Sequence, residues 1–427
     1  MAAPEEIPPP DHRSAFRRLA PFFAAIYFVQ GIAEPGAGIA SQPLFYLLKD
    51  GLHLGPAGTA TFMAAVAVAW TVKPLYGLTS DFFPLFGYRR KSYLLCATAL
   101  AAAGWFFLGL QPSHAYGPTL VVLILCGLGL AFSDVLCDAV MVETGKPLGM
   151  TGRFQSVQWG AINTASLLAG VGGGWLAQHV SPQRTFLVVS AFPALSFVTT
   201  ALTLREPKSR FDREGLRATG RAIWSAIGSR PLWLAAGFIF LWNFSPSFGV
   251  PLNYYMVDTL KFSKLSLGTL GSLGAGAAIA GAFLFGRHFR HLPMRPLLNI
   301  SVGIGVLSTL AYWGLVGWWS AVLLAVVTGA STMIAMLATL DLAARSCPAR
   351  GEGTFFAALM SVNNLAAIAS ASVGGRLFEA VGLQKLVFIS AAATAVCWLL
   401  VPFIRLPEPA ANEEATPPAG EPVAEVT

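Results

Sequence analysis

The sequence predicts an all-α membrane protein with twelve transmembrane helices in two pseudo-symmetric six-helix halves. Three observations support this prediction. The 427 residues are 55% hydrophobic and only 11% charged, whereas soluble domains carry about 25% charged residues. The apolar residues form runs of membrane length, and most cations lie between alternate runs. A segment of the first half also matches a segment of the second half at a fixed offset.

The apolar runs give the predicted helices. A helix needs ~20 predominantly apolar residues to cross a membrane. In the first half we expect spans at 20–48, 56–80, 91–111, 117–143, 152–178 and 183–204. In the second half we expect spans at 231–257, 265–286, 297–316, 318–343, 353–378 and 383–405. The first run is longer than the ~7–15 apolar residues of a signal peptide, which favours an uncleaved helix.

These spans divide the chain into five parts: an N-terminal tail at 1–19, a first half at 20–204, a basic loop at 205–230, a second half at 231–406 and a C-terminal tail at 407–427. The last tail contains five Glu, several Pro and no Lys or Arg. This composition is typical of a disordered segment.

The cations predict the orientation of the chain. If the N-terminus is cytoplasmic, the inner segments contain 21 Lys and Arg and the outer segments contain 6. Cytoplasmic loops carry the excess of Lys and Arg. We therefore expect both termini and the tails to be cytoplasmic, in an inner or plasma membrane. The cations lie at the ends of apolar runs rather than on one polar face, which argues against nucleic-acid binding.

An internal repeat relates the two halves. An offset of 201 positions places Gly152 on Gly353 and Asn163 on Asn364. The same offset aligns Gly173, Gly174, Leu176, Val180 and Gln183 with identical residues. Two six-helix halves that are parallel repeats, joined by a basic loop, describe the major facilitator architecture.

The connection between the second and third spans reads KPLYGLTSDFFPLFGYRRKSYL from Lys73. It resembles the major facilitator loop at this place, in which a Gly is followed four residues on by an Asp and then by a Gly and paired cations. Gly77 and Asp81 match that spacing, and Gly87 comes three residues later than in the general pattern. This longer form resembles the folate–biopterin transporter family, as do SDVLCDAVMVETGK and GRFQSVQWG in residues 133–160.

The resemblance is densest over residues 70–180. It implies a secondary transporter that moves folate, biopterin or a related pteridine by alternating access. Muropeptide permeases of the same superfamily carry a similar loop and a similar D-x-x-x-D-A pattern. The alternative is therefore a permease for muropeptides or another organic anion. The resemblance implies a transporter and not an enzyme.

Charged residues inside spans are candidates for substrate binding or proton coupling, because each costs about 2.5–3.5 kcal/mol at a helix centre. Glu34 lies near the middle of the first span beside Pro35, and helix breaks of this kind free backbone groups toward a cavity. Asp134 and Asp138 are four residues apart and share a helix face. Lys73 lies at the same predicted depth, which indicates a pair with Asp134 or Asp138. A purely structural ion pair is the alternative.

Amide and aromatic side chains are further candidates for the substrate site. A pterin ring is planar and rich in hydrogen-bond donors and acceptors, which amides and aromatic faces suit. Hydrogen bonds between helices are the alternative role. The candidates are Gln158, Trp159, Asn163, Asn243, Asn363 and Asn364.

Residues near the cytoplasmic ends of helices are candidates for a gate. Asp81 can accept hydrogen bonds from a helix N-terminus or from Arg153 and so hold the inside closed. Setting the orientation of the chain is the alternative role of the cations. The gating candidates are Gly77, Asp81, Gly87, Arg89, Arg90 and Arg153.

No catalytic residue, metal site or cofactor is indicated, because the sequence lacks HExxH, GxSxG and CxxC patterns. The expected partners are a small-molecule substrate, protons and the lipid bilayer, and the expected state is a monomer. A proton-coupled transporter of this kind is a symporter.

Overall fold

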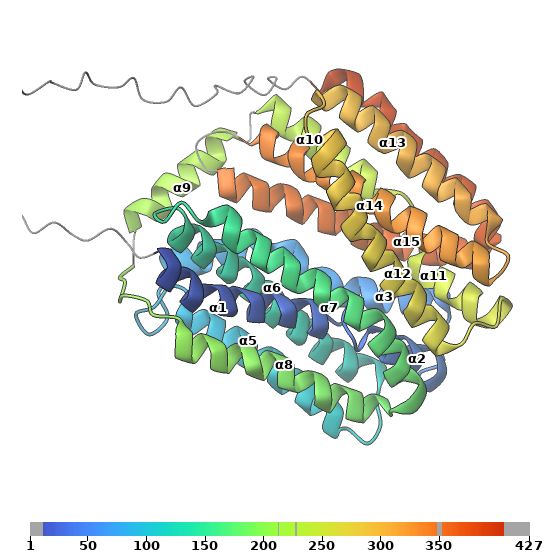
Figure 1. The fold of residues 1–427 in the computed structure, drawn as a ribbon, viewed down its shortest axis with the longest axis horizontal. Coiled ribbons are helices and arrows are strands. Elements are labelled where there is room, and N and C mark those ends of the chain that lie inside the picture. The colour runs from blue at the N-terminus through green and yellow to red at the C-terminus, as the bar shows by residue number, and fades with distance from the viewer. Residues whose placement is uncertain (1–11, 212, 227–228, 348–351, 405–427) are drawn as a thin grey trace, which may run out of the picture.

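The computed structural model describes residues 12–211, 213–226, 229–347 and 352–404. Apart from one isolated β-bridge, the regular secondary structure of these residues is helical. Residues 1–11 of the predicted N-terminal tail, the predicted disordered tail 407–427, Arg350 and Arg405 lie outside the described residues. The expected all-α fold class is confirmed. Figure 1 shows the helices packed side by side as one bundle.

The first half comprises the following helices: α1 (His12–Ala33), α2 (Ser41–Tyr46), η1 (Leu47–Gly51), α3 (Pro56–Val66), η2 (Ala67–Val72), α4 (Lys73–Phe82), α5 (Lys91–Leu110), α6 (Tyr116–Gly145), α7 (Thr151–His179) and α8 (Pro182–Thr203). The helix α9 (Arg213–Ala226) joins the halves. The second half comprises α10 (Arg230–Phe244), α11 (Gly249–Tyr254), η3 (Tyr255–Thr259), α12 (Lys264–Leu284), η4 (Phe285–Phe289), α13 (Met294–Ala311), η5 (Tyr312–Gly314), α14 (Trp318–Ser346), α15 (Glu352–Ala395), η6 (Val396–Leu399) and η7 (Val401–Phe403).

Nine stretches of the described chain are long and apolar enough to cross a membrane. The last of them, Thr354–Phe403, contains two helices that meet at Gly382, where φ is +77°. Two further long stretches, α1 to η1 and α7, contain more polar residues and fall outside the nine. Counted together, these stretches supply the six helical segments expected in each half.

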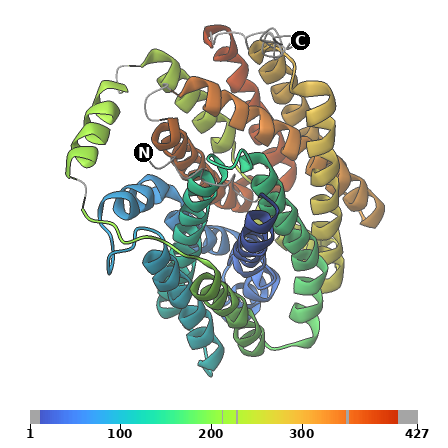
Figure 2. The same cartoon turned by 60° about the vertical axis from the view of Figure 1, so that its left-hand side comes forward.

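The two halves lie side by side, with α9 outside them as the connection (Figure 2). Phe211, just before α9, packs on Phe83 after α4, with ring centroids 5.3 Å apart. At the start of α13, Arg295 donates to the carbonyls of Pro402 and Ile404 at 2.8 and 3.0 Å. These contacts fasten the connecting segment to the first half and the end of the described chain to the second.

The first helical stretch of each half is broken at a proline. In the first half the break covers residues 34–40, and in the second half it covers residues 245–248. Proline lacks the N–H that an α-helix needs and so interrupts the helix. The carbonyls left free find partners nearby: Ser390 donates its hydroxyl to the carbonyl of Pro246 at 2.5 Å.

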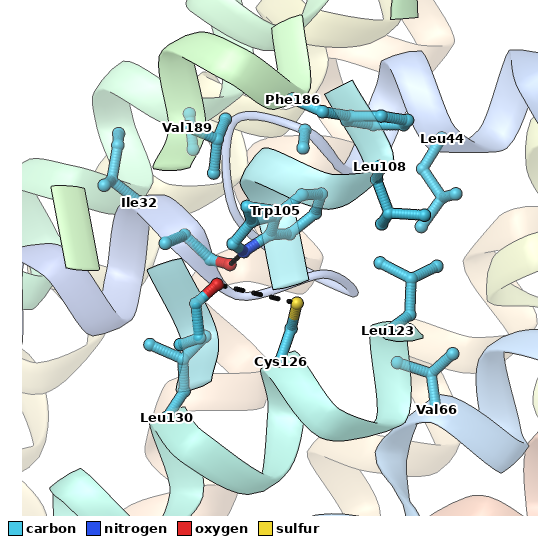
Figure 3. Close-up of a cluster of buried hydrophobic side chains, with 14 of the residues drawn as sticks. Ile32, Leu44, Val66, Trp105, Leu108, Leu123, Cys126, Leu130, Phe186 and Val189 are labelled. Carbon is cyan, nitrogen blue, oxygen red and sulfur yellow. Dashed lines mark hydrogen bonds between the residues drawn. The ribbon is translucent and has the colours of Figure 1, made fainter. Parts of the chain in front are cut away.

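A buried tryptophan stabilises the break in the first half. Trp105 of α5 is fully buried and packs among Ile32, Leu44 and Phe186 (Figure 3). Its indole N–H donates to the carbonyl of Ala33, the last residue of α1, at 3.1 Å. The carbonyl that the break leaves without a helical partner is thereby satisfied, and the following residue, Glu34, is held at the end of α1.

The halves contact each other closely at the end of the bundle formed by α2, α11 and the start of α12. Tyr254 shares a hydrogen bond with Thr59 at 2.7 Å and donates to the carbonyl of Leu54. Lys49 and Asp258 form an ion pair at 2.8 Å. Glycines on α7 and α12 allow the backbones to meet: a Cβ at Gly174 would lie 2.8 Å from the carbonyl oxygen of Lys264.

Candidate functional site

The second membrane stretch changes its helix type at the candidate site. It passes from α3 through the 3₁₀ segment η2 to α4. In an α-helix the carbonyl of Trp70 would accept from the N–H of residue 74, and Pro74 has none. That carbonyl instead accepts a hydrogen bond from the amide of Asn364 in the second half, at 2.7 Å. The sequence therefore produces a contact between the two halves at mid-helix.

Lys73 begins α4 and pairs with a carboxylate on α6. Its Nζ lies 2.6 Å from Oδ2 of Asp134, whose side chain is only 7% exposed. The same Nζ lies 4.7 Å from the centre of the Trp70 ring. Of the two pairings that the sequence predicts for Lys73, the structure shows the one with Asp134. A buried cation needs such a partner, because one charge alone is costly to keep away from water.

Asp138 lies one helical turn beyond Asp134 and has neutral partners. The hydroxyl of Tyr27 on α1 donates to its Oδ1. The amide of Gln158 on α7, a residue only 1% exposed, donates to the same oxygen at 3.4 Å. The two carboxylates of α6 therefore lie in different surroundings, one paired with a cation and one with neutral donors.

Glu34 completes a group that we call the carboxylate cluster: Glu34, Asp134, Asp138 and Lys73. Oε1 of Glu34 accepts from the indole of Trp70 at 3.3 Å. Its Oε2 is buried and has no hydrogen-bond partner among the described residues. Trp70 therefore contacts both Glu34 and Lys73, which places one side chain between the first helix and the ion pair.

Three amides form what we call the amide row: Asn243, Asn363 and Asn364. Asn243 donates to Oδ1 of Asn363 at 2.8 Å, and Asn363 donates to Oδ1 of Asn364 at 3.3 Å. Since Asn364 donates to Trp70, hydrogen bonds lead from α10 through α15 to the carboxylate cluster. The second half is thus connected to the charged groups of the first half.

The structure does not bring Trp159 and Asn163 into this arrangement. The amide of Asn163 donates to the carbonyl of Trp159 on its own helix, at 2.7 Å. The Trp159 residue is 37% exposed. Asn163 and its repeat mate Asn364 therefore differ in the contacts they make, although they occupy equivalent places in the two halves.

A cavity of about 1030 Å³ lies beside the amide row, and we call it the second-half cavity. Asn243 and Asn363 line it. Only three of the described residues that line it, Ser41, Gln42 and Phe45, belong to the first half. This cavity therefore lies next to the carboxylate cluster and does not contain it.

The gating candidates lie around Arg90, between α4 and α5. Its guanidinium donates to Asp81 and Ser80, and to Glu143 at 2.7 Å. Burial alone would lower the pKa of Arg90, but the negative charges of Asp81 and Glu143 outweigh burial and raise it. Arg89 lies 3.8 Å from Glu143. These contacts link the ends of α4, α5 and α6.

Three other gating candidates lie at different places. Gly77 is within α4, where its carbonyl accepts from the hydroxyl of Ser80 at 3.1 Å. Gly87 has a φ of +85°, a region that favours glycine, and its carbonyl accepts from the N–H of Ser209 at 2.8 Å. The guanidinium of Arg153 lies 4.9 Å from the ring of Phe16, whereas Asp81 is bound by Arg90.

Sequence reasoning missed four residues of these groups: Tyr27, Trp70, Ser80 and Glu206. The carboxylate of Glu206 accepts from the backbone N–H groups of Arg89, Arg90 and Lys91 at 2.8–3.0 Å. For Trp70 a signal was present, because it lies four residues before Pro74 and near Lys73. Ser80 lies beside the predicted Asp81 and ten residues before its partner Arg90. For Tyr27 and Glu206 the sequence offers no signal, since their partners are 111 and 117 residues away along the chain.

Comparison with known proteins identifies similar chains. The BT1 family matches residues 30–407. The chain is 30% identical over 397 residues to the Folate-biopterin transporter of Synechocystis sp., with 90% of this chain and 79% of that protein covered. It is 24% identical over 440 residues to the Probable folate-biopterin transporter 4 of Arabidopsis thaliana, covering 84% and 88%. It is 26% identical over 265 residues to Folate transporter 1 of Plasmodium falciparum, covering 62% and 52%.

Solved structures share the fold at lower identity. The nucleoside transporter NupG superposes with a TM-score of 0.70 and 12% identity, over 90% of this chain and 98% of that one. The D-xylose-proton symporter superposes with a TM-score of 0.67 and 14% identity, over 93% and 99%. These similarities show the major facilitator fold, and identities this low show the fold alone.

Proposed function

The chain belongs to the BT1 family of folate–biopterin transporters, and from that membership we propose that it moves a pteridine across its membrane together with protons. As a member of this family it is a multi-pass membrane transporter of the major facilitator type and not an enzyme. The relatives from Synechocystis sp. and P. falciparum are named for folate or biopterin transport. The substrate class of this chain is our inference from those names and from the site.

The single observation that carries the proposal is the hydrogen-bonded route from the second-half cavity to the carboxylate cluster. Asn243 and Asn363 line the cavity, and Asn364 reaches the backbone of Trp70. A heteroaromatic ring offers donors and acceptors that amides can bind. A ligand that displaces hydrogen bonds in the amide row would therefore change the contacts of Trp70 with Glu34 and Lys73.

Glu34 is the group that we assign to proton binding. Its buried Oε2 has no donor among the described residues, and an ionised carboxylate buried in that way is unfavourable. Asp134 is neutralised by Lys73, and Asp138 is bound by Tyr27 and Gln158. A proton on Glu34 would remove the negative charge of this buried carboxylate in the present state. Release of that proton would accompany rearrangement around Trp70.

The gating proposal rests on the contacts between helix ends. We assign the group around Arg90 to the cytoplasmic side, in agreement with the excess of cations in the predicted inner segments. The contacts of Tyr254, Lys49 and Gly174 then close the outer side in this state. In this proposal both termini are cytoplasmic, the membrane is an inner or plasma membrane, and the working unit is a monomer.

The test is uptake into vesicles containing the purified protein. We expect labelled biopterin or folate to accumulate unchanged when the interior is made alkaline, and to stop accumulating when a protonophore is added. Glu34→Gln should bind and exchange substrate without responding to the pH gradient. Glu214→Gln, at an exposed position on α9, is the matched control and should behave as the unmodified protein.

Three results would count against the proposal. Accumulation of the labelled pteridine to the same level with and without the pH gradient would exclude proton coupling. Uptake of an anhydro-muropeptide without uptake of any pteridine would favour the alternative substrate class. A chemically altered substrate inside the vesicles would contradict simple transport.

A further inference from the structure

The second-half cavity has a chemical feature that bears on which pteridine it accepts. Among the residues that the structure describes, none that lines the cavity is Asp, Glu, Lys, Arg or His. Its surface is formed by apolar, aromatic and neutral polar side chains contributed by α10 to α15 and by α2. A cavity of about 1030 Å³ is large enough for a substrate of several rings. The cavity therefore has room for either pteridine, and the chemistry of its lining decides which one binds better.

The polar groups that the cavity does offer are neutral donors and acceptors. Hydroxyl groups of α13 and α14 and amides of α10 and α15 are among the groups that line it. Hydroxyls and amides bind ring nitrogens and carbonyl oxygens by hydrogen bonds, without requiring a charge on the ligand. Such groups in the lining include Ser308, Thr309, Thr328, Thr332, Asn243 and Asn363.

The neighbouring carboxylate cluster does not supply a free cation. Lys73 is its one cation, and Asp134 binds it at 2.6 Å. Glu34 and Asp138 add two further carboxyl groups. With Asp134 ionised, the cluster is therefore neutral or negative, according to how many protons Glu34 and Asp138 hold, and it offers no unpaired cation to a carboxylate on a ligand.

We infer that the site selects pteridines that carry no carboxylate, and that it disfavours those conjugated to glutamate. This inference rests on the proposed function and narrows its substrate class. Folate carries the two carboxylates of its glutamate, whereas biopterin is neutral and carries a hydroxylated side chain. In a cavity without cations, a carboxylate would lose its hydration and gain no ion pair.

Competition for binding to the full-length protein tests the inference. Labelled biopterin is displaced with unlabelled biopterin, with pteroic acid, which has one carboxylate, and with folic acid, which has two. We expect affinity to fall in that order, with folic acid roughly 100-fold weaker than biopterin, since a site rejects groups that it leaves unpaired. Folic acid that binds as tightly as biopterin would overturn the inference while leaving the proposed function intact.

A substitution that adds a cation to the lining provides the second test. Met336 on α14 lines the cavity and is 43% exposed, so Met336→Lys places an ammonium group there on a side chain of similar length. We expect it to improve folic acid binding relative to biopterin by at least about tenfold. Met336→Gln adds a polar group of similar length without charge and should keep the ratio of the two affinities.

Met333→Lys, also in the lining, repeats the test if the first variant does not reach the membrane. An unchanged ratio in a variant that is folded and inserted would contradict the inference. If no pteridine binds the unmodified protein at all, the proposed function itself fails. If folic acid binds best instead, only the inference about carboxylates fails. Failure of the proposed function and failure of this inference therefore give different results.

Discussion

Pro74 removes the only backbone N–H that could bond the carbonyl of Trp70 within an α-helix. That carbonyl lies where the two halves meet, and it accepts a hydrogen bond from the side-chain amide of Asn364. The indole of the same residue donates to Glu34, and its ring face lies against Lys73. Trp70 thus connects through its backbone to one half and through its side chain to the charged groups of the other.

Asn364→Leu should remove the backbone connection of Trp70 and leave its side-chain contacts with Glu34 and Lys73 in place. It removes the hydrogen bond to Trp70 and keeps a side chain of similar size, so we expect uptake to fall by roughly tenfold, as for a lost buried hydrogen bond of about 1–1.5 kcal/mol. Uptake is measured per molecule of protein in the membrane. Asn163→Leu is the control at the equivalent repeat position, where the amide bonds only its own helix. Equal losses in both variants would contradict the role assigned to Asn364.

Lys73→Ala should leave Asp134 charged and unpaired in a buried position. Breaking a buried pair on one side costs about 3–5 kcal/mol, so we expect a large loss of thermal stability and of protein in the membrane. Lys73→Ala with Asp134→Asn should recover stability without recovering transport. Lys385→Ala, at an exposed position, is the control. A stable, active Lys73→Ala variant would exclude both a structural and a functional role for the pair.

At the residue scale the sequence predicted a pair of Lys73 with Asp134 or Asp138, because helix lengths determine the depth of a residue in the membrane. It did not predict Tyr27 beside Asp138 or Trp70 beside Glu34. Those contacts depend on how α1 and η2 are rotated about their axes. Helix rotation is set by packing against several neighbours at once, which residue spacing in one helix does not describe.

Among the elements, α5 has an unusual N-terminus. The first N–H groups of a helix lack partners within it. The carboxylate of Glu206 accepts from the N–H of Lys91, the first residue of α5, and from those of Arg89 and Arg90 just before it. Glu206 follows α8, so this cap also fixes the end of α8 against the start of α5. It holds Arg90 where it can bind Asp81 and Glu143.

Glu206→Ala should therefore reduce stability by about 1–2 kcal/mol, as the loss of a helix cap does. Thermal unfolding in detergent measures this as a lower midpoint temperature. Glu206→Gln keeps an acceptor oxygen, so its midpoint temperature should lie between those of Glu206→Ala and the unmodified protein. The control is Glu214→Ala, because Glu214 is exposed on α9. The cap has no stabilising role if Glu206→Ala and Glu214→Ala unfold alike.

The packing of α7 on α12 is the second feature at the scale of elements. A Cβ at Gly170 would lie 2.8 Å from the carbonyl oxygen of Gly268, and one at Gly174 would lie 3.2 Å from Cα of Leu265. Small residues on facing helices allow this close approach in membranes. The two helices belong to different halves, so their contact depends on the conformation of the whole transporter.

Gly174→Val should hold α7 and α12 apart. We expect uptake to fall at least about tenfold, because off-size side chains in tight packing cost about 1–3 kcal/mol. Spin labels near the ends of α7 and α12 should report a longer distance than in the unmodified protein. Gly160→Val is the control, since a Cβ there meets no atom within 4 Å. An unchanged distance in Gly174→Val would show that this packing does not set the conformation.

For the whole molecule, the pair of Lys49 with Asp258 joins the halves directly at 2.8 Å. Asp258 is half exposed, so the pair contributes at most about 1 kcal/mol, and its effect should decrease with salt. Lys49→Asp should favour separation of the halves at this end and lower uptake a few-fold. The double variant Lys49→Asp with Asp258→Lys should restore uptake. Failure of the double variant to improve on the single one would exclude the pair as the cause.

The twelve-helix plan was predictable from the sequence because length, apolarity and cation position are all set by the membrane. The repeat that aligns Asn163 with Asn364 also predicted that α7 and the first part of α15 are equivalent helices of the two halves. The break at residues 34–40 and the change to a 3₁₀ helix at residues 67–72 were only partly predictable. Pro35 signals a break, but the length of a break depends on neighbours such as Trp105, which come from other helices.

The separation of the cavity from the carboxylate cluster has a consequence for how such transporters diverge. Nearly all described residues that line the cavity belong to the second half, whereas Glu34, Lys73 and Asp134 belong to the first. Mutations can therefore alter ligand preference in one gene segment while the groups that we propose for proton coupling, in the other segment, stay under constant selection. New specificities can arise in this scaffold without passing through an uncoupled ancestor.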